Sequence, residues 1–480
     1  MSFLDRFFRR WRRPQGPTAW AAPEAPAPRP AVRLEPEAPR SEPHPVQSGI
    51  REPAPAAASF PRFASTATDQ FSRSLADRLA AIRMKLREAF TPGQPITERK
   101  RFAGRTKLLA AVIRALEDQR LHVIVFGDRG IGKTSLLHVL TQAAKEARYQ
   151  VVYFSCGAGS TFEEVIRTVA GGIPLLYHAD FGPTSAEAES GGTFAKQLPE
   201  GESISTRAAG DLLTKVVGTR VLMVLDEFDR SEQLAFRQSI AELIKILSDR
   251  KARVQLVIAG VAANVHELVR HIPSIQRNVL ALQVPKMTGP EIRHLVRTGE
   301  ESSGVAFEDD AIREIVRRSI GFPYLASLLS HHASLAAVEA ERTTVIQEDV
   351  ATAVEEATQE LRARLSARTQ AQVDRCVDEG LLKALGALAG AAQTSAGQFT
   401  LEDVTGLFAT AEEIASCRDM TERLAREHVL LEARDDDTGR HFRFLDETVP
   451  SYLWLLAIHA RDAEETEPVA DHPTPAPANL

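Results

Sequence analysis

A short glycine-rich segment, residues 127–134, constrains the fold of this 480-residue chain more than any other feature. It reads GDRGIGKT and fits the pattern G-x-x-x-x-G-K-[ST]. The apolar run HVIVF precedes it at 122–126, and the helical pattern TSLLHVL follows it from residue 134. Glycines allow a tight turn in which backbone N–H groups converge at the start of a helix. The segment therefore predicts an α/β unit with an anion site at the end of a buried strand.

Each part of this segment matches a requirement of phosphate binding. The loop N–H groups can point at phosphate oxygens, and the helix that starts at Lys133 adds its positive dipole end. Lys133 can neutralise the β and γ phosphates, and the Thr134 hydroxyl can ligate Mg²⁺. We therefore expect nucleotide binding by one continuous run of residues: Gly127, Asp128, Arg129, Gly130, Ile131, Gly132, Lys133, Thr134 and Ser135.

A second apolar run, VLMVL at 221–225, ends in the acidic pair Asp226 and Glu227. Ligands of open parallel sheets bind at the carboxyl ends of the strands, so both side chains are expected beside the glycine-rich loop. Asp226 is predicted to share the Mg²⁺ shell with Thr134, and Glu227 to orient and activate the attacking water. The adjacent glutamate favours hydrolysis over phosphoryl transfer to a small acceptor.

Strand and helix patterns alternate around these motifs. Strands are expected at 122–126, 150–155, 221–225 and 254–259, and helices at 133–147, 162–170, 207–217 and 232–248. Near-continuous runs of Val, Ile and Leu are typical of strands buried on both faces of a parallel sheet. Residues 177–204 are rich in Gly, Ser, Glu and Pro without periodicity, which predicts a surface insertion loop.

The chain divides into six predicted parts. After residue 285 only helical patterns continue, and residues 370–460 read as three helices and a β-hairpin, the order of a winged helix-turn-helix. We expect a basic amphipathic helix at 1–13, a Pro/Ala-rich disordered linker at 14–68, an α/β core with a leading helix at 69–285, a helical lid at 286–366, a winged helix at 367–460 and a disordered acidic, Pro-containing tail at 461–480.

The N-terminal segment MSFLDRFFRRWRR places its apolar residues on one helical face and carries a formal charge of +4. Such an element fits an anionic membrane surface or a groove in a partner, and the alternative is a frayed terminus. Thirteen of the 27 prolines lie in residues 14–61, a composition that cannot bury enough apolar surface to fold.

Composition excludes several classes of protein. A net charge of −6 argues against a generally basic nucleic-acid coat. The three cysteines, Cys156, Cys376 and Cys417, are too far apart for a zinc ribbon and show no disulfide pattern. No apolar run reaches the roughly 18 residues of a membrane span, and arginines interrupt the N-terminus where a secretory signal would be apolar. We predict a cytoplasmic protein, peripheral at the membrane if residues 1–13 bind lipid, with no metal beyond Mg²⁺.

These motifs resemble the AAA+ class of P-loop ATPases, and within it the branch of origin-recognition-like and STAND-type ATPases, over about residues 95–460. Segment 102–105 (FAGR) resembles the F-x-G-R box near the adenine, and 321–323 (GFP) resembles the G-x-P turn of STAND-type lids. The resemblance implies ATP hydrolysis and nucleotide contacts by Phe102, Arg105 and Pro323. It also implies ATP rather than GTP, and no guanine-reading N/T-K-x-D motif follows the core.

Two positions depart from the family pattern. Strand 254–259 should end in a polar residue that senses the γ-phosphate, yet Ala259 and Gly260 stand there, with Asn264 as a weak substitute. An arginine acting across a subunit interface is implied, and Arg277 is the candidate, which implies a nucleotide-dependent homo-oligomer. A surface arginine or a lid salt bridge is the alternative. If both positions are degenerate, turnover is slow and the protein acts as a switch.

The partner is left open. The third helix of the predicted winged helix, 411–427, carries five acidic and three basic residues, a poor match to a DNA backbone, so double-stranded DNA and a protein both stay candidates. The sequence supports an ATPase that remodels or loads DNA or a protein complex. The alternatives are an ATP-dependent signalling switch with little turnover and a membrane-associated scaffold.

Overall fold

The computed structural model describes residues 75–181, 185–201, 203–231, 233–262, 277–394, 397–436 and 439–466. The predicted helix at 1–13, the linker at 14–68 and Asn264 lie outside these ranges, as does the tail beyond Thr466. In the part of the chain that the structure describes, no helix combines the length and apolar character needed to cross a membrane.

The core is a five-stranded sheet in which every neighbouring pair runs parallel. Its strands are β1 (His122–Phe126), β2 (Gln150–Ser155), β3 (Val221–Asp226), β4 (Val254–Gly260) and β5 (Val279–Gln283), in the order β2-β3-β4-β1-β5. The predicted parallel α/β core and its four predicted strands are confirmed. Strand β5 was not predicted from the sequence, because this edge strand is only half-buried and lacks a continuous apolar run.

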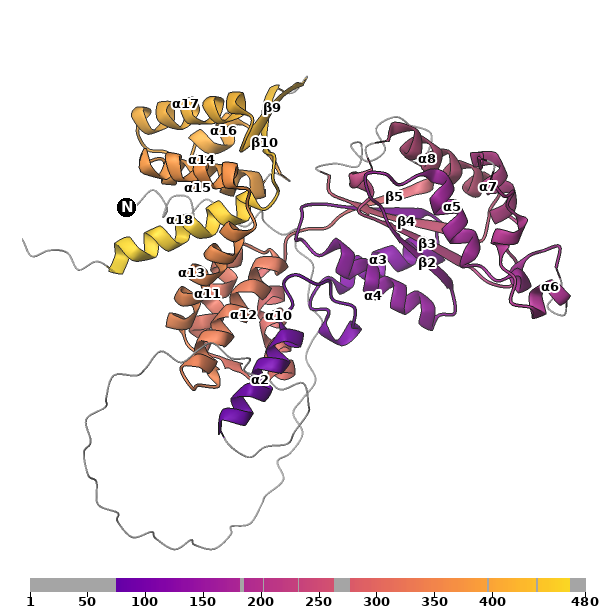
Figure 1. Cartoon of the computed structure of the whole chain (residues 1–480), viewed down its shortest axis with the longest axis horizontal. Helices are drawn as coiled ribbons and strands as arrows, with labels where there is room; N and C mark the ends of the chain where they lie inside the picture. The colour runs from indigo at the N-terminus through magenta and orange to yellow at the C-terminus, as the bar shows by residue number, and fades with distance from the viewer. Residues whose placement is uncertain are drawn as a thin grey trace, which may run out of the picture. The chain divides into compact units, whose positions relative to one another are not determined.

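Helices cover both faces of the sheet (Figure 1). They are α3 (Thr106–Glu117) and α4 (Lys133–Glu146) on one face, and α5 (Phe162–Gly171), α7 (Thr206–Leu213) and α8 (Leu234–Asp249) on the other. Side chains of α5, α7 and α8 form one continuous apolar core with β2, β3 and β4. This packing holds the carboxyl ends of β1 and β3 at the same edge of the sheet.

The segment between α5 and α7 is not the surface loop that its composition predicts. It contains η2 (Leu175–Tyr177), α6 (Ala186–Glu189) and η3 (Phe194–Gln197), and Leu175 and Phe194 are fully buried. The ring of His178 meets that of Phe194 edge-on at 4.8 Å. The prediction was wrong because single apolar residues anchor short turns here, which leaves no periodicity to detect.

A helical lid follows β5. It consists of α10 (Gly289–Ser303), α11 (Asp309–Ser319), α12 (Pro323–Glu339) and α13 (Gln347–Ala363), with a small parallel pair, β6 (Ala306–Phe307) and β7 (Thr344–Val345). The leading helix α2 (Leu75–Ala89), which the sequence grouped with the core, packs on α10 and α12. Phe90, the residue after α2, is buried against α10. A Cβ atom added to Gly299 of α10 would lie 2.1 Å from the Phe90 ring, so only glycine fits at that position.

The C-terminal region contains helices and a three-stranded antiparallel sheet of order β8-β10-β9. Its elements are α14 (Ala367–Asp378), α15 (Leu382–Thr394), β8 (Gln398–Phe399), α16 (Leu401–Thr405), α17 (Ala411–Glu427), β9 (Leu431–Asp436), β10 (Gly439–Phe444) and α18 (Val449–Thr466). The order from α15 to β10 agrees with a winged helix, which stays a prediction. Helix α18 was not predicted, and it continues to Thr466, beyond the expected start of the tail at residue 461.

Helix α18 joins the C-terminal region to the lid. It packs against α15 and against α13. The Trp454 indole N–H donates to the Arg318 carbonyl at 2.8 Å, and Arg362 of α13 donates to the Tyr452 hydroxyl at 3.0 Å. Arg362 also pairs with Asp374 of α14 at 2.7 Å. These contacts connect α11 and α13 of the lid with α14 and α18.

Candidate functional site

The glycine-rich loop lies between β1 and α4, as predicted. Gly127, Gly130 and Gly132 have φ values of 144°, 70° and 90°, in the region that favours glycine. A Cβ on Gly132 would lie 2.8 Å from Arg105 Nη1, and one on Gly130 would lie 3.2 Å from Tyr324 Cβ. The loop therefore needs glycine both for its backbone conformation and for the close approach of its neighbours.

Lys133, the first residue of α4, is 9% exposed and points back into the loop. Its Nζ donates to the carbonyl oxygens of Gly127 at 2.9 Å and Asp128 at 2.8 Å. Burial lowers the pKa of this lysine, and nearby acids, led by Asp229, oppose that shift. A buried ammonium whose hydrogen bonds go to neutral carbonyls is a site that an anion would stabilise.

The acidic pair lies at the carboxyl end of β3. Asp226 is 3% exposed, and its Oδ2 accepts from the Tyr153 hydroxyl at 2.5 Å while its Oδ1 accepts from the Glu227 N–H at 2.8 Å. Glu227 adopts φ 54°, and its Oε2 accepts from Ser155 Oγ and pairs with Arg230 Nη1, both at 3.1 Å. Tyr153 and Ser155 were not predicted as site residues. Their polar groups at the end of β2 were the available signal.

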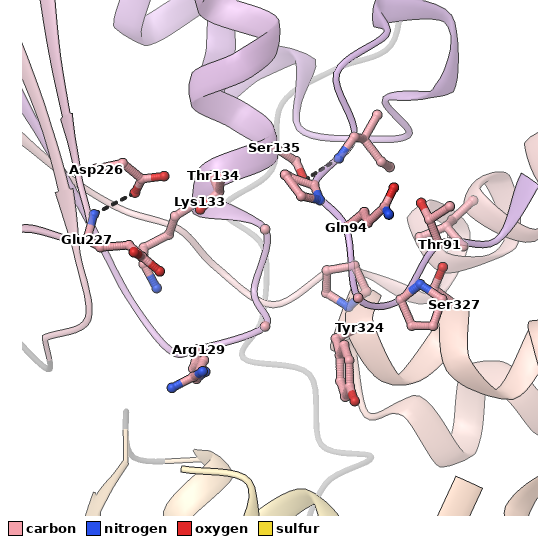
Figure 2. Close-up of a pocket in the computed structure, with 18 of the residues that line it drawn as sticks. Thr91, Gln94, Arg129, Lys133, Thr134, Ser135, Asp226, Glu227, Tyr324 and Ser327 are labelled. Carbon is pink, nitrogen blue, oxygen red and sulfur yellow. Dashed lines mark hydrogen bonds between the residues drawn. The ribbon is translucent and has the colours of Figure 1, made fainter. Parts of the chain in front are cut away.

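One cavity of about 430 Å³ connects the glycine-rich loop, the acidic pair and the lid. Polar side chains lie at its two ends (Figure 2): Lys133, Asp226 and Glu227 at one, and Thr91, Gln94 and Ser327 at the other. A volume of this size lies within the range of small-molecule sites. Residues 91–96 form part of the wall, and the Ile96 N–H donates to Ser135 Oγ at 3.0 Å.

The predicted nucleotide-binding residues divide into two groups. The first lines the cavity and consists of Arg129, Gly130, Gly132, Lys133, Thr134, Ser135 and Pro323. The second does not line it and consists of Gly127, Asp128, Ile131, Phe102 and Arg105.

Arg105 is buried behind the loop. Its Nη1 donates to the Ile131 carbonyl and its Nη2 to the Pro285 carbonyl at 2.9 Å. Its backbone N–H donates to Glu291 Oε1 of α10 at 3.0 Å. Burial lowers the pKa of Arg105 to about 10. The arginine thus connects the glycine-rich loop with the segment that leads into the lid.

The lid supplies part of the cavity wall. Leu295 and Thr298 of α10 and the first residues of α12, Pro323 and Tyr324, line it. The Tyr324 hydroxyl accepts from Arg364 Nη1 at 3.0 Å. The cavity therefore has contributions from both the sheet and the lid.

The tip of β4 and Arg277 are the two positions at which the sequence departs from the family pattern. Ala259 and Gly260 are buried at the tip of β4, and the next residue, Val261, donates its N–H to Asp229 Oδ1 at 2.7 Å. Asn264 lies outside the described residues, so its predicted role stays untested. Arg277 is exposed and is not among the residues that line the cavity, and its action on a neighbouring subunit stays a prediction.

An ion pair joins the glycine-rich loop to the residues before α18. Arg129 of the loop pairs at 2.8 Å with Glu447, which precedes α18 and also borders the cavity.

Among the described residues, no group of three or more His, Cys, Asp and Glu side chains could hold a metal ion. Thr134 and Asp226 both line the cavity and offer the oxygen ligands that Mg²⁺ prefers.

A family model described as Novel STAND NTPase 1 matches residues 90–441. Solved structures similar to the chain include Cdc6p from Pyrobaculum aerophilum (15% identity, 78% of this chain and 98% of that chain, TM-score 0.41). A Walker-type ATPase of Pyrococcus abyssi is also similar (13% identity, 76% of this chain and 99% of that chain, TM-score 0.46). Orc1 of Aeropyrum pernix, solved in complex with DNA, is similar as well (15% identity, 79% of this chain and 98% of that chain, TM-score 0.37). These TM-scores are too low to bear on function, and no curated protein matches the chain.

Proposed function

The chain belongs to the Novel STAND NTPase 1 family, and we propose that it binds ATP with Mg²⁺ and hydrolyses it to ADP and phosphate. We further propose that the nucleotide state sets the position of the lid and the C-terminal region, and that the protein acts in this way on a protein complex. One observation carries the proposal: a single cavity is walled by the glycine-rich loop, the acidic pair and lid helices α10 and α12.

Lys133 and the loop N–H groups would hold the phosphates. The buried Lys133 ammonium supports this role, because a phosphate can replace the two loop carbonyls that its Nζ contacts. Thr134 and Asp226 would hold Mg²⁺, which would neutralise charge on the phosphates. The base would lie toward Thr91, Gln94 and Ser327, at the end of the cavity away from Asp226 (Figure 2).

Glu227 would orient and deprotonate the attacking water. It lines the cavity beside Asp226, but its Oε2 is bound by Ser155 and Arg230. A general base must have a free lone pair within hydrogen-bond reach of the water. The two bonds occupy Oε2 alone, but they restrain how the carboxylate can turn toward the water, which supports slow turnover and a protein that spends most of its time as an ATP-bound or ADP-bound switch.

The contacts between lid and C-terminal region support transmission of the nucleotide state. Pro323 and Tyr324 put the first turn of α12 into the cavity wall, so loss of the γ-phosphate would change what the lid contacts. Helix α13 packs on α18, and Trp454 and Arg362 connect the two regions. A lid movement would therefore carry the C-terminal region with it.

Charge in the C-terminal region favours a protein partner over DNA. Residues 367–460 contain nine Lys and Arg against sixteen Asp and Glu, a formal charge of −7. Arg423 of α17 pairs with Glu379 at 2.5 Å, and Arg440 of the hairpin pairs with Glu422 at 3.0 Å. Binding to a duplex grows with the number of phosphates that cations neutralise, and five of the nine cations here already pair with carboxylates: Arg375, Arg423, Arg434, Arg440 and Arg443.

Phosphate release by the purified full chain tests the proposal. We expect slow release with Mg²⁺-ATP, at least about 100-fold slower release by Glu227→Gln with ATP binding retained, and loss of ATP binding by Lys133→Ala. Duplex DNA should leave the rate unchanged. Equal rates for the wild type and Glu227→Gln would refute the assigned water-activating role, and absence of ATP binding by the wild type would refute the proposed function. Stimulation by DNA would refute the choice of a protein partner.

A further inference from the structure

Strand β2 directs two hydroxyl groups at the acidic pair of β3. Tyr153 and Ser155 are two residues apart, so their side chains leave the same face of the strand. Ser155 pairs in register with Asp226 along the parallel ladder. The Tyr153 hydroxyl donates to Asp226 Oδ2 at 2.5 Å, within the range of a charge-assisted O–H···O⁻ bond. The proposed ligand of Mg²⁺ is thus in direct contact with a tyrosine of the neighbouring strand.

Asp226 depends on its donors because it is buried. A carboxylate that is 3% exposed is costly unless hydrogen bonds replace its lost water. The Tyr153 hydroxyl occupies Oδ2 and the Glu227 N–H occupies Oδ1, at 2.5 and 2.8 Å. A carboxylate has about four lone-pair positions, so both oxygens can still accept on the side that lines the cavity. Two donors from different segments therefore determine which way the remaining lone pairs point.

Tyr153 is itself held in place from the other side. The ring of His138 stacks on the tyrosine ring with centroids 4.9 Å apart and planes at 7°. His138 belongs to α4, the helix that begins with Lys133 and Thr134. The contact joins the two segments that would supply the Mg²⁺ ligands.

We propose that Tyr153 is a positioning residue for Mg²⁺: its hydroxyl orients the Asp226 carboxylate so that the carboxylate can enter the ligand shell of the cation. This inference rests on the proposed function, in which Asp226 and Thr134 hold Mg²⁺. Loss of a group that orients a metal ligand typically lowers metal affinity by about 10-fold or more. Tyr153→Phe should therefore require about 10 times more Mg²⁺ than the wild type for the same nucleotide binding.

Nucleotide binding measured against Mg²⁺ concentration tests this inference. Binding of N-methylanthraniloyl-ATP to the full chain is followed by fluorescence, first in EDTA and then as Mg²⁺ is added. Tyr149→Phe is the matched control, because its hydroxyl bonds Arg220 at 3.1 Å and does not line the cavity. We expect the Mg²⁺ midpoint to rise about 10-fold in Tyr153→Phe and to stay unchanged in Tyr149→Phe, with binding in EDTA the same in all three proteins. Excess Mg²⁺ should restore nucleotide affinity in Tyr153→Phe.

Three results would overturn the inference. An unchanged Mg²⁺ midpoint in Tyr153→Phe would show that Asp226 needs no help from the hydroxyl, while leaving the proposed function intact. Weaker binding in EDTA would show that the hydroxyl supports the fold of the site and not the cation. Absence of any Mg²⁺ effect on the wild type would overturn the proposed Mg²⁺ site and this inference together.

Discussion

Replacing Ser155 with alanine should raise the rate of ATP hydrolysis, because it removes one of the two groups that bind the Glu227 carboxylate. Ser155 Oγ and Arg230 Nη1 each lie 3.1 Å from Glu227 Oε2. The Glu227 side chain is 38% exposed, so water competes for this hydrogen bond, and about 0.5–1 kcal/mol is a reasonable net contribution. At 25 °C that free energy corresponds to a rise of about two- to fivefold in the population of released Glu227.

Phosphate release at saturating Mg²⁺-ATP should therefore be about two- to fivefold faster in Ser155→Ala. The ATP dissociation constant should not change, because Ser155 does not line the cavity. Ser155→Thr is the control, since threonine keeps the hydroxyl and suits a strand. A rate in Ser155→Ala equal to or below that of the wild type, with Ser155→Thr unchanged, would refute the idea that Ser155 restrains Glu227.

Three further changes test other parts of the molecule. Gly299→Ala would put a Cβ 2.1 Å from the Phe90 ring, so thermal melting should show a loss of stability of about 1–3 kcal/mol; an unchanged melting temperature would contradict the packing of α2 on the lid. Burial lowers the pKa of Lys286 from 10.5 to about 8, so the unfolded chain binds more protons between these values and stability should rise as pH increases from about 8 to 10.5. Urea unfolding across that range should show the rise in the wild type, and the same rise in Lys286→Met would exclude Lys286 as its source. Arg277→Ala should slow ATP hydrolysis in a way that depends on protein concentration while leaving ATP binding unchanged, and equal rates at all concentrations would count against a role across a subunit interface.

The central strands were predictable because burial on both faces leaves a signature in the sequence. Strand β3 is entirely buried, and its unbroken run of Val, Leu and Met has no polar position that could face solvent. Strand β5 and helix α18 were not predicted from the sequence, for opposite reasons. The edge strand β5 is only half-buried, whereas α18 buries the consecutive residues Tyr452, Leu453, Trp454 and Leu455 and so loses the 3.6-residue periodicity of a surface helix.

The two motifs of the candidate site were also predictable, because each is one continuous segment at the end of one strand. The loop at 127–132 with Lys133, and the pair Asp226 and Glu227, require only local backbone geometry to reach the edge of the sheet. The position of Arg105, by contrast, was not predictable from local sequence. Its motif was recognisable, but its contacts with Ile131 and Pro285 reach 26 and 180 residues along the chain and turn it away from the cavity.

The reactive groups of the candidate site can be read from the sequence: a glycine-rich loop, a lysine, a hydroxyl and two carboxylates on a parallel α/β core. The surroundings of these groups depend on the folded structure. It put Tyr153 and Ser155 against the acidic pair, brought segment 91–96 and Tyr324 to the cavity wall, and packed α2 on the lid instead of the sheet. Periodicity and spacing record which residues are buried, whereas hydrogen bonds between distant segments depend on strand order and register, which no single segment encodes.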